Sequence, residues 1–321
     1  MDRSSLFEAL KKPLAETNFP TLGRKYAGKV RDCYTTEDGR RILIVTDRIS
    51  AFDRSLGVLP LKGQILNSVA RFWFEKTKHI VPNHVLDVPD PNVMIGMECT
   101  PLPVEMVLRG YLTGTTSTSI WRHYEAGVRE FCGHRLPEGM RKHQKLDEIL
   151  LTPSTKAAHG EHDVSASREE ILKLTGMPAE DFDEAERLAR LLYAEGERIC
   201  AERGLILVDT KYEFGKAKDG RIVVIDEIHT PDSSRFWFRE TYQDRFQAGQ
   251  DPESFDKEYL RRYLANLGFT GEGPLPPIPD EVRVESTVRY QKAIEQIMGV
   301  PFEPNLEEPI ERIRKNLRIA Q

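Results

Sequence analysis

The sequence predicts an α+β fold with two lobes around a cleft. Short apolar runs rich in β-branched residues, bounded by turn residues, occur early in the chain and again at 205–225. Helical periodicity lies between these runs and dominates after residue 256. This order suits an α+β enzyme. We predict an N-terminal antiparallel sheet lobe at 1–105 and a larger mixed α/β lobe at 106–321, with the hinge near Glu105–Leu108.

The composition restricts the class of protein and its partners. Hydrophobic residues make up 39% and charged residues 30% of the 321 positions, as in soluble globular proteins. A net charge of −5 argues against general nucleic-acid binding. No stretch approaches the roughly 20 apolar residues that span a bilayer, and the N-terminus lacks a signal-peptide core. The four scattered cysteines favour reduced thiols in a cytoplasmic protein over a zinc site.

The N-terminal region predicts a short helix and a hairpin. The helix is expected before Pro13. Arms at 26–34 and 42–45 are joined by the Asp38-Gly39 turn. Gly28-Lys29 falls on the first arm, where close backbone approach and an ammonium group could serve a phosphate. A single Gly-Lys pair also occurs in merely solvated strands, so both interpretations stay open.

The second arm runs into a segment dense in short polar groups. Ser50, Ala51 and Asp53 follow the buried run, and loops at strand ends often carry binding residues. A turn that caps a helix would favour the same residue types. The next segment, 64–76, predicts a helix with apolar residues at core-facing spacing: Leu66, Val69, Ala70 and Trp73.

A buried strand at 104–108 runs directly into Arg109 and the glycines and hydroxyls that follow it. This composition suits an anion site, although a surface turn could share it. Residues 131–163 lack long apolar runs and predict an ordered loop, whose histidines have no metal spacing. Helices are predicted over five segments: 167–175, 183–203, 256–267, 279–298 and 307–319.

Gly204 to Trp237 predicts a β-hairpin with charged residues at its ends. The apolar runs 205–208 and 222–225 flank the turn residues Lys218-Asp219-Gly220. Asp209, Lys211 and Glu213 alternate and so share one face of a strand. If Asp219-Gly220 is a two-residue turn, Glu213 lies opposite Asp226. Such carboxylates suit Mg²⁺ held together with nucleotide phosphates, or else a solvated hairpin edge.

Several common catalytic motifs are absent from the sequence. It contains no GxxxxGK[ST] loop, no GxGxxG after the first strand, no HExxH and no GxSxG. What remains is a set of cations and carboxylates at strand ends. Lys29 and Lys211 could contact phosphate or carboxylate groups, Glu213 and Asp226 could hold Mg²⁺, and Arg109 and Arg235 could clamp anions. Such a site works by positioning and charge stabilisation.

Five segments occur in an order that resembles one enzyme family. They are Gly28-Lys29-Val30-Arg31-Asp32, Ser50-Ala51-Phe52-Asp53, Arg109-Gly110-Tyr111-Leu112-Thr113-Gly114, Asp209-Thr210-Lys211-Tyr212-Glu213-Phe214-Gly215 and the twelve residues from Asp226 to Trp237. Together they resemble phosphoribosylaminoimidazole-succinocarboxamide synthase, the SAICAR synthetase of purine biosynthesis. Residues 152–156 and 160–163 are similar to the insert of the longer, single-chain members, which suggests a monomer.

The resemblance implies a SAICAR synthase-like fold with an ATP cleft between its lobes. It also implies an ATP- and Mg²⁺-dependent ligase that joins L-aspartate to the carboxylate of carboxyaminoimidazole ribotide (CAIR). The products would be SAICAR, ADP and phosphate, formed through an acyl phosphate. The implied partners are these small molecules, with no nucleic acid and no membrane.

The resemblance further assigns roles to individual residues. Gly28, Lys29, Val30 and Arg31 would meet the ATP phosphates, and Glu105 with the backbone of Met106 and Val107 would meet adenine. Glu213 and Asp226 would carry Mg²⁺ at the nucleotide. The CAIR phosphate would be held by Arg109, Thr115 and Arg235, and its carboxylate by Lys211. Ser50, Ala51, Asp53, Asp232, Ser233 and Ser234 would shape the CAIR and aspartate pockets. Lys29, Lys211 and Asp209 are the residues implied in catalysis.

Two departures from the shorter members leave details open. Thr115-Thr116-Ser117 follows Gly114 where shorter members have serine, so the hydroxyl that meets phosphate is not fixed. The spacing of His229-Thr230 after Asp226 also differs. Two rival functions remain: another ATP-using ligase or small-molecule kinase, and a non-enzymatic nucleotide- or metal-binding module. Strict dependence of ADP release on both CAIR and aspartate separates the ligase from the first rival. The second rival predicts that Asp226→Asn or Lys211→Ala changes binding without affecting any turnover.

Overall fold

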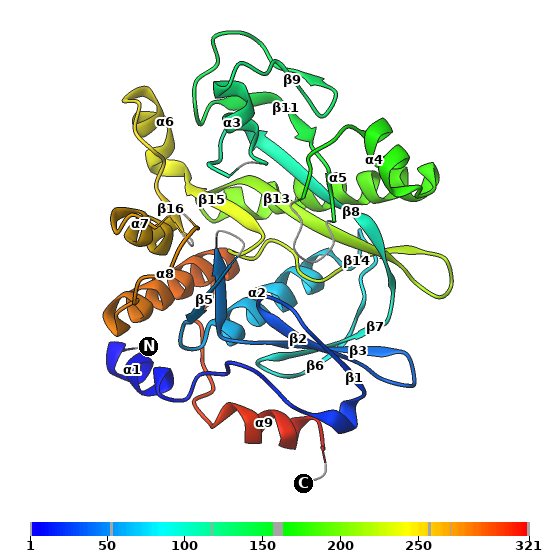
Figure 1. Ribbon diagram of the computed structural model, residues 1–321, viewed down its shortest axis with the longest axis vertical. Coiled ribbons are helices and arrows are strands. Elements are labelled where there is room, and N and C mark those ends of the chain that lie inside the picture. Colours follow the sequence, from blue (N-terminus) through cyan, green and yellow to red (C-terminus); the bar gives the residue numbers. More distant parts are fainter. Residues whose placement is uncertain are drawn as a thin grey trace.

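Two antiparallel sheets form the frame of the molecule. The computed structural model describes residues 2–51, 54–116, 118–156, 163–255, 258–269 and 271–319. Figure 1 shows the first sheet in the lower half of the view and the second above it, with helices around both. The α+β class predicted from the sequence is confirmed. A lobe boundary at residue 105 stays a prediction.

The first sheet has the strand order β1-β2-β3-β7-β6. Its strands are β1 Arg24–Ala27, β2 Arg31–Thr35, β3 Arg40–Val45, β7 Val93–Met97 and β6 Val85–Asp90. The predicted hairpin is confirmed, because β2 and β3 pair antiparallel on either side of Asp38-Gly39. The prolines at 82, 89, 91, 101 and 103 predict loops, and the structure corrects this by forming β6 and β7 in the same region. Pro89 is tolerated in β6 because this strand lies at the sheet edge.

Three short elements and one long helix complete the N-terminal region. They are α1 Arg3–Leu10, which confirms the helix before Pro13, the pair β4 Arg48–Ala51 and β5 Arg54–Val58, and α2 Lys62–Thr77. The four apolar positions predicted to face the core from α2 are all buried. Trp73 is fully buried there.

The second sheet is built on two twelve-residue strands that pair with each other. The order is β11-β8-β13-β15-β16, with β12 on β8 and β14 on β13. The strands are β8 Thr100–Tyr111, β11 Lys145–Leu151, β12 Ser154–Thr155, β13 Leu205–Lys216, β14 Ile222–Ile225, β15 Ser234–Phe238 and β16 Ser254–Phe255. β8 extends the predicted strand through Arg109. The predicted loop at 131–163 contains β11 and β12, together with the pair β9 Glu130–Phe131 and β10 His134–Arg135.

The hairpin at 204–226 differs from the prediction in its register. Glu213 lies opposite Ile225 and not opposite Asp226. The turn has three central residues, 218–220, because the Ala217 N–H donates to Arg221 O at 2.9 Å and Gly220 has φ 88°. A three-residue loop with glycine in the left-handed conformation shifts the pairing by one residue from a two-residue turn. The predicted first arm, 205–208, pairs instead with β15.

Helices cover the sheets and form the C-terminal part of the chain. They are α3 Ile120–Glu125, α4 Arg168–Thr175, α5 Ala179–Glu202, α6 Arg239–Gln247, α7 Glu258–Asn266, α8 Asp280–Met298 and α9 Pro309–Asn316. The five predicted helices are confirmed, although α5 begins four residues early, after Pro178. Helix α6 was not predicted from the sequence, and it has no buried residue.

One hydrophobic core joins the two sheets. Its largest cluster includes Leu43 of β3, Trp73 of α2, Met106 of β8 and Leu207 of β13. The segment after α2 is also hydrogen bonded to β14, because His84 N donates to Val224 O at 3.2 Å. All four cysteines are free thiols, as predicted. Within the residues described, no helix is both long and apolar enough to cross a membrane.

Candidate active site

A row of charged side chains crosses three neighbouring strands of the second sheet. Asp209 on β13 lies opposite Arg109 on β8 and opposite Arg235 on β15. Arg235 donates to Asp209 Oδ2, and an Arg109 nitrogen lies 3.8 Å from the same oxygen. Cross-strand partners stand side by side on one face of a sheet. The structure therefore brings the two predicted anion-binding arginines together around one carboxylate.

Arg109 is held in place by the insert after β11. Its Nε donates to Thr152 Oγ1 at 2.7 Å, and a terminal nitrogen donates to Thr118 O at 3.1 Å. Burial and the nearby Arg235 lower the pKa of Arg109, although a guanidinium stays charged in proteins. Thr152 belongs to the segment expected to form an ordered loop, so this part of the insert helps to build the site.

Lys211 and the carboxylates around it form a second group on the same pair of strands. Lys211 Nζ lies 2.5 Å from Glu105 Oε1 and 3.0 Å from Glu213 Oε1. Glu105 and Glu213 are direct cross-strand partners. Like charges in these positions repel, and the ammonium between them offsets this. Lys156, from the insert, also donates to Glu213. Lys156 was predicted only as part of the insert and not as a site residue.

Burial and charge act in opposite directions on these groups. Burial alone would lower the pKa of Lys211, but Glu213 and Glu105 overcome it and raise that pKa. Burial raises the pKa of Glu213, yet Lys211 and Lys156 outweigh it and hold the pKa below its ordinary value. Burial dominates at Glu105 and raises its pKa. Glu213 is therefore ionised, and its oxygens can serve as metal ligands.

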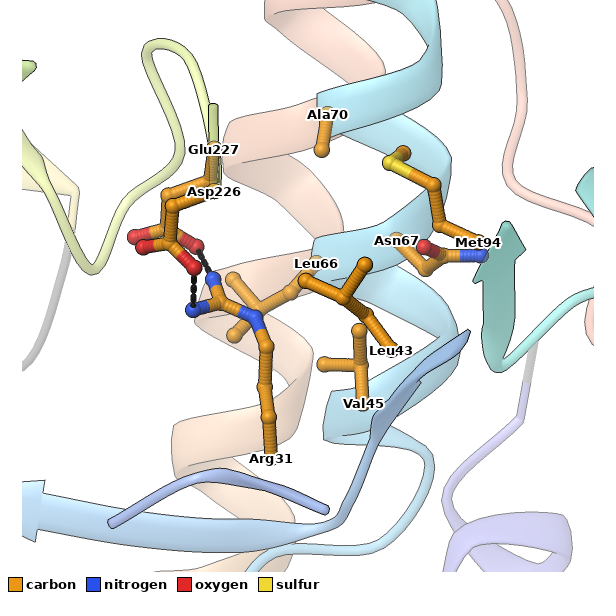
Figure 2. Close-up of a pocket in the computed structure, with 9 residues that line it drawn as sticks. All are labelled: Arg31, Leu43, Val45, Leu66, Asn67, Ala70, Met94, Asp226 and Glu227. Carbon is orange, nitrogen blue, oxygen red and sulfur yellow. Dashed lines mark hydrogen bonds and ion pairs between the residues drawn. The ribbon is translucent and has the colours of Figure 1, made fainter. Parts of the chain in front are cut away.

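Arg31 joins the first sheet to the loop after β14. One nitrogen of its guanidinium lies 2.5 Å from Asp226 Oδ1, and the other donates to Glu227. Figure 2 shows both carboxylates converging on Arg31 beside a small cavity between β3, α2 and β7. Asp226 has φ 70°, so the chain leaves its strand at this residue. Glu227 was missed, although it directly follows a predicted ligand.

The predicted metal ligands lie in one region without forming a closed cage. Glu213 lies opposite Ile225, the residue directly before Asp226. Among the residues that the structure covers, no three histidine, cysteine or acidic side chains are grouped to hold a metal. Mg²⁺ binds through one or two carboxylates when phosphates and water complete its shell. The carboxylates of Glu213 and Asp226 fit this way of binding Mg²⁺, and the metal itself stays a prediction.

The glycine-lysine segment lies in a turn and not on a strand. The predicted position on the hairpin arm is wrong, because Gly28, Lys29 and Val30 connect β1 to β2. Gly28 N donates to Arg31 O at 2.8 Å and closes the turn. A turn exposes backbone groups that a strand would use for pairing, so the change of place leaves the segment able to meet an anion.

The backbone predicted to contact adenine is inside the sheet. Met106 is fully buried and pairs with Tyr212 of β13. The carbonyl oxygen of Val107 accepts the N–H of Thr152 at 2.8 Å. The carboxylate of Glu105 accepts hydrogen bonds from Lys211 Nζ and from the hydroxyl of Ser154, the second at 3.3 Å. Adenine could bind the carbonyl oxygen of Val107 only by displacing the N–H of Thr152. The adenine contact therefore stays a prediction, and this geometry disfavours it.

The segment 232–234 uses its side chains to hold itself in place. Asp232 accepts Lys62 Nζ at 2.8 Å and the Tyr290 hydroxyl at 2.7 Å. The Ser234 and Thr210 hydroxyls lie 2.7 Å apart, and Ser233 Oγ accepts a backbone N–H at 3.2 Å. Lys62 and Tyr290 were missed, because nothing in the sequence ties them to residue 232. Direct substrate contact by this segment stays a prediction.

Other predicted substrate residues lie at the ends of strands. Ser50 is half-buried and Ala51 buried at the end of β4. Asp53, like Ser117 and residues 157–162, falls outside the described residues. Thr115 and Thr116 are exposed in the loop after β8. Their exposure leaves either hydroxyl able to meet a ligand.

Comparisons with known proteins agree on one family. The family model described as SAICAR synthetase matches residues 24–276. Phosphoribosylaminoimidazole-succinocarboxamide synthase of Legionella pneumophila (strain Lens) is 49% identical over 290 residues, 90% of this chain and 92% of that protein. The chloroplastic synthase of Arabidopsis thaliana is 46% identical over 316 residues, 96% and 76% of the two chains. The Saccharomyces cerevisiae SAICAR synthase, solved in complex with SAICAR, has a TM-score of 0.76 at 29% identity and covers 91% of this chain and 100% of its own.

Proposed function

The chain belongs to the SAICAR synthetase family of ligases, and we propose that it joins L-aspartate to the carboxylate of CAIR in an ATP-dependent reaction. The products are SAICAR, ADP and phosphate, in purine biosynthesis. The yeast relative was solved with SAICAR, and we extend that ligand to this chain. The reaction runs on a monomer in the cytoplasm, in a cleft between the two sheets.

The pair of guanidinium groups around Asp209 carries this proposal. Arg109 and Arg235 come from different strands and reach the same oxygen of Asp209. Two arginines so placed can bind a phosphate monoester through several charge-assisted hydrogen bonds. We assign them to the CAIR phosphate, with Thr115 as an added hydroxyl. Asp209 keeps both groups oriented before the ligand enters.

Lys211 is assigned to the CAIR carboxylate. Its ammonium already bridges Glu105 and Glu213, so an incoming carboxylate meets a cation fixed in position. Lys29 and the turn around it are assigned to the ATP phosphates. These groups act by positioning and by stabilising charge, which is the main source of catalysis in phosphoryl transfer.

Mg²⁺ is assigned to Glu213 and Asp226. Glu213 is ionised, and both side chains offer the hard oxygen donors that this metal prefers. The bound metal would neutralise charge on the ATP phosphates. Arg31, Lys156 and Lys211 neutralise the two carboxylates when no metal is bound.

The proposed reaction has two steps. A carboxylate oxygen of CAIR attacks the γ-phosphorus of ATP, and ADP leaves. The aspartate amine then attacks the acyl carbon, phosphate leaves, and the amide of SAICAR forms. Lys211 holds the reacting carboxylate, while Arg109 and Arg235 fix the far end of the same substrate. Neither step requires a nucleophilic side chain.

A coupled assay of ADP release tests the proposal. We expect release to depend strictly on both CAIR and L-aspartate, with SAICAR formed in equal amount. Release without aspartate would contradict the ligase reaction and favour a kinase. Size-exclusion chromatography of the active enzyme tests the monomer separately.

A further inference from the structure

Arg48, the first residue of β4, supports the turn between β1 and β2. Its guanidinium donates to three backbone carbonyl oxygens: Ala15 at 2.6 Å, Gly28 at 2.9 Å and Lys29 at 3.2 Å. It also forms an ion pair with Asp32 at 2.8 Å. The donors of one side chain therefore fix two consecutive peptide groups of the turn.

Asp32 fixes the direction of Arg48. Its carboxylate is fully buried, and Oδ2 accepts the N–H and hydroxyl of Thr17 at 2.6 and 3.0 Å. Lys25 Nζ lies 3.2 Å from the same oxygen. The other oxygen, Oδ1, accepts from Arg48. A carboxylate that accepts hydrogen bonds from so many donors cannot rotate freely. Its fixed orientation holds Arg48 against the turn.

Thr46 continues the pattern at the next peptide group. Its N–H and hydroxyl donate to Val30 O at 3.0 and 2.8 Å. The carbonyl oxygens of Gly28, Lys29 and Val30 thus all accept hydrogen bonds from Arg48 or Thr46. A trans peptide directs its C=O and the following N–H to opposite sides, and the described part of the chain contains no cis peptide bond.

It follows that the N–H groups of Lys29, Val30 and Arg31 point away from Arg48 and Thr46. Successive backbone N–H groups on one side of a turn form a site for an anion. The Lys29 ammonium adds a positive charge to the same turn. The structure therefore explains how a turn without a glycine-rich loop can present backbone donors to phosphate.

We propose that Arg48 is a positioning residue for the nucleotide. Its hydrogen bonds keep the carbonyl oxygens of the turn, which would repel a phosphate, on the side facing Arg48. The N–H groups on the opposite side are thereby directed towards the phosphate. This inference rests on the proposed binding of ATP phosphates at Lys29. Lysine cannot replace Arg48, because an ammonium is a point donor and lacks the planar fork that reaches several carbonyls at once.

The variant Arg48→Lys tests the inference in the full chain. Isothermal titration calorimetry would compare the Kd of ATP with that of adenosine, which has no phosphate. We expect the Kd of ATP to rise about tenfold and that of adenosine to stay unchanged. The KM for ATP should rise with it, while the KM values for CAIR and aspartate stay as in the wild type.

Arg190→Lys is the matched control. Arg190 lies on the exposed face of α5, where it donates to Glu186 at 2.8 Å and to the carbonyl oxygen of Ile149 at 3.1 Å. The same substitution there should leave both Kd values unchanged. If Arg48→Lys fails to fold, Thr46→Val removes one donor of the same set and should raise the Kd of ATP about threefold.

The outcomes separate this inference from the proposed function. Equal ATP affinity in the wild type and a folded Arg48→Lys variant overturns the inference alone. Equal weakening of ATP and adenosine also overturns it, since the turn would then support the whole pocket and not the phosphate site. A wild-type protein that binds ATP nowhere refutes the proposed function.

Discussion

Replacing Lys62 by methionine removes one half of a buried ion pair. Lys62 Nζ lies 2.8 Å from Asp232, and the two side chains are 1% and 6% exposed. Tyr290 donates to the other oxygen of Asp232 at 2.7 Å. Methionine keeps an extended side chain but carries no charge. The carboxylate would therefore lose this ammonium without gaining access to water.

The expected loss of stability follows from that burial. Removing one partner of a buried pair costs about 3–5 kcal/mol, mostly because the remaining charge stays desolvated. With an unfolding entropy of about 2 cal/mol/K per residue, a chain of this length should lose roughly 4–7 °C in Tm. Adding Asp232→Asn removes the orphaned charge, so the double variant should recover more than half of the loss.

Scanning calorimetry and urea unfolding measure the effect. The control is Lys78→Met at the C-terminal cap of the same helix, where the pair with Glu75 is exposed at 60% and 61%. Exposed pairs contribute about 0–1 kcal/mol, so this variant should unfold close to the wild type. Equal shifts for Lys62→Met and Lys78→Met would refute the reasoning.

Three further variants test other parts of the structure. Arg235→Ala removes a charge-assisted contact worth about 1.5–3 kcal/mol and should raise the KM for CAIR far more than that for ATP; an equal rise for both rules out the assignment. Gly196→Ala should destabilise the protein by about 1–3 kcal/mol in urea unfolding, because the new Cβ would lie 2.5 Å from His229 Nε2; a gain in stability, the usual result in a helix, would show that the ring moves aside. Burial raises the pKa of Asp47 from 3.8 to about 6, so the folded state binds the proton more tightly and the contribution of this group to stability should fall as pH rises from about 4 to about 6. Asp47→Asn lacks this contribution, so the stability of the wild type relative to the variant should fall over this range, and parallel pH profiles for the two proteins would contradict the shift.

The sequence predicted the strands of the site better than the contacts between them. Alternation placed Asp209, Lys211 and Glu213 on one strand, and all three form ion pairs in the site. The partner of Glu213 was wrong by one residue, because a three-residue and a two-residue turn can share the dipeptide Asp219-Gly220. Local sequence does not decide between them.

Periodicity and motif spacing could not predict contacts between residues that lie far apart in the sequence. Tyr290 and Asp232 are 58 residues apart, and Lys62 lies 170 residues before Asp232. Arg48 differs, because its neighbours in sequence were noted as a polar segment. Its role depends on which carbonyl oxygens face it, and only the folded backbone fixes that. Strand β6 was not predicted because it contains a proline. Proline argues against a strand unless that strand is known to lie at the edge of a sheet.

The buried pair between Arg312 and Asp90 has a consequence for synthesis on the ribosome. Arg312 in α9 donates to Asp90 at 2.9 Å across 222 residues of chain, and neither side chain is more than 2% exposed. At about 5–20 residues per second, the nascent first sheet would wait roughly 10–45 seconds for this arginine. During that time Asp90 must stay hydrated, so the end of the first sheet at β6 would remain open. Helix α9 would thus close the first sheet only after the other described elements have been made.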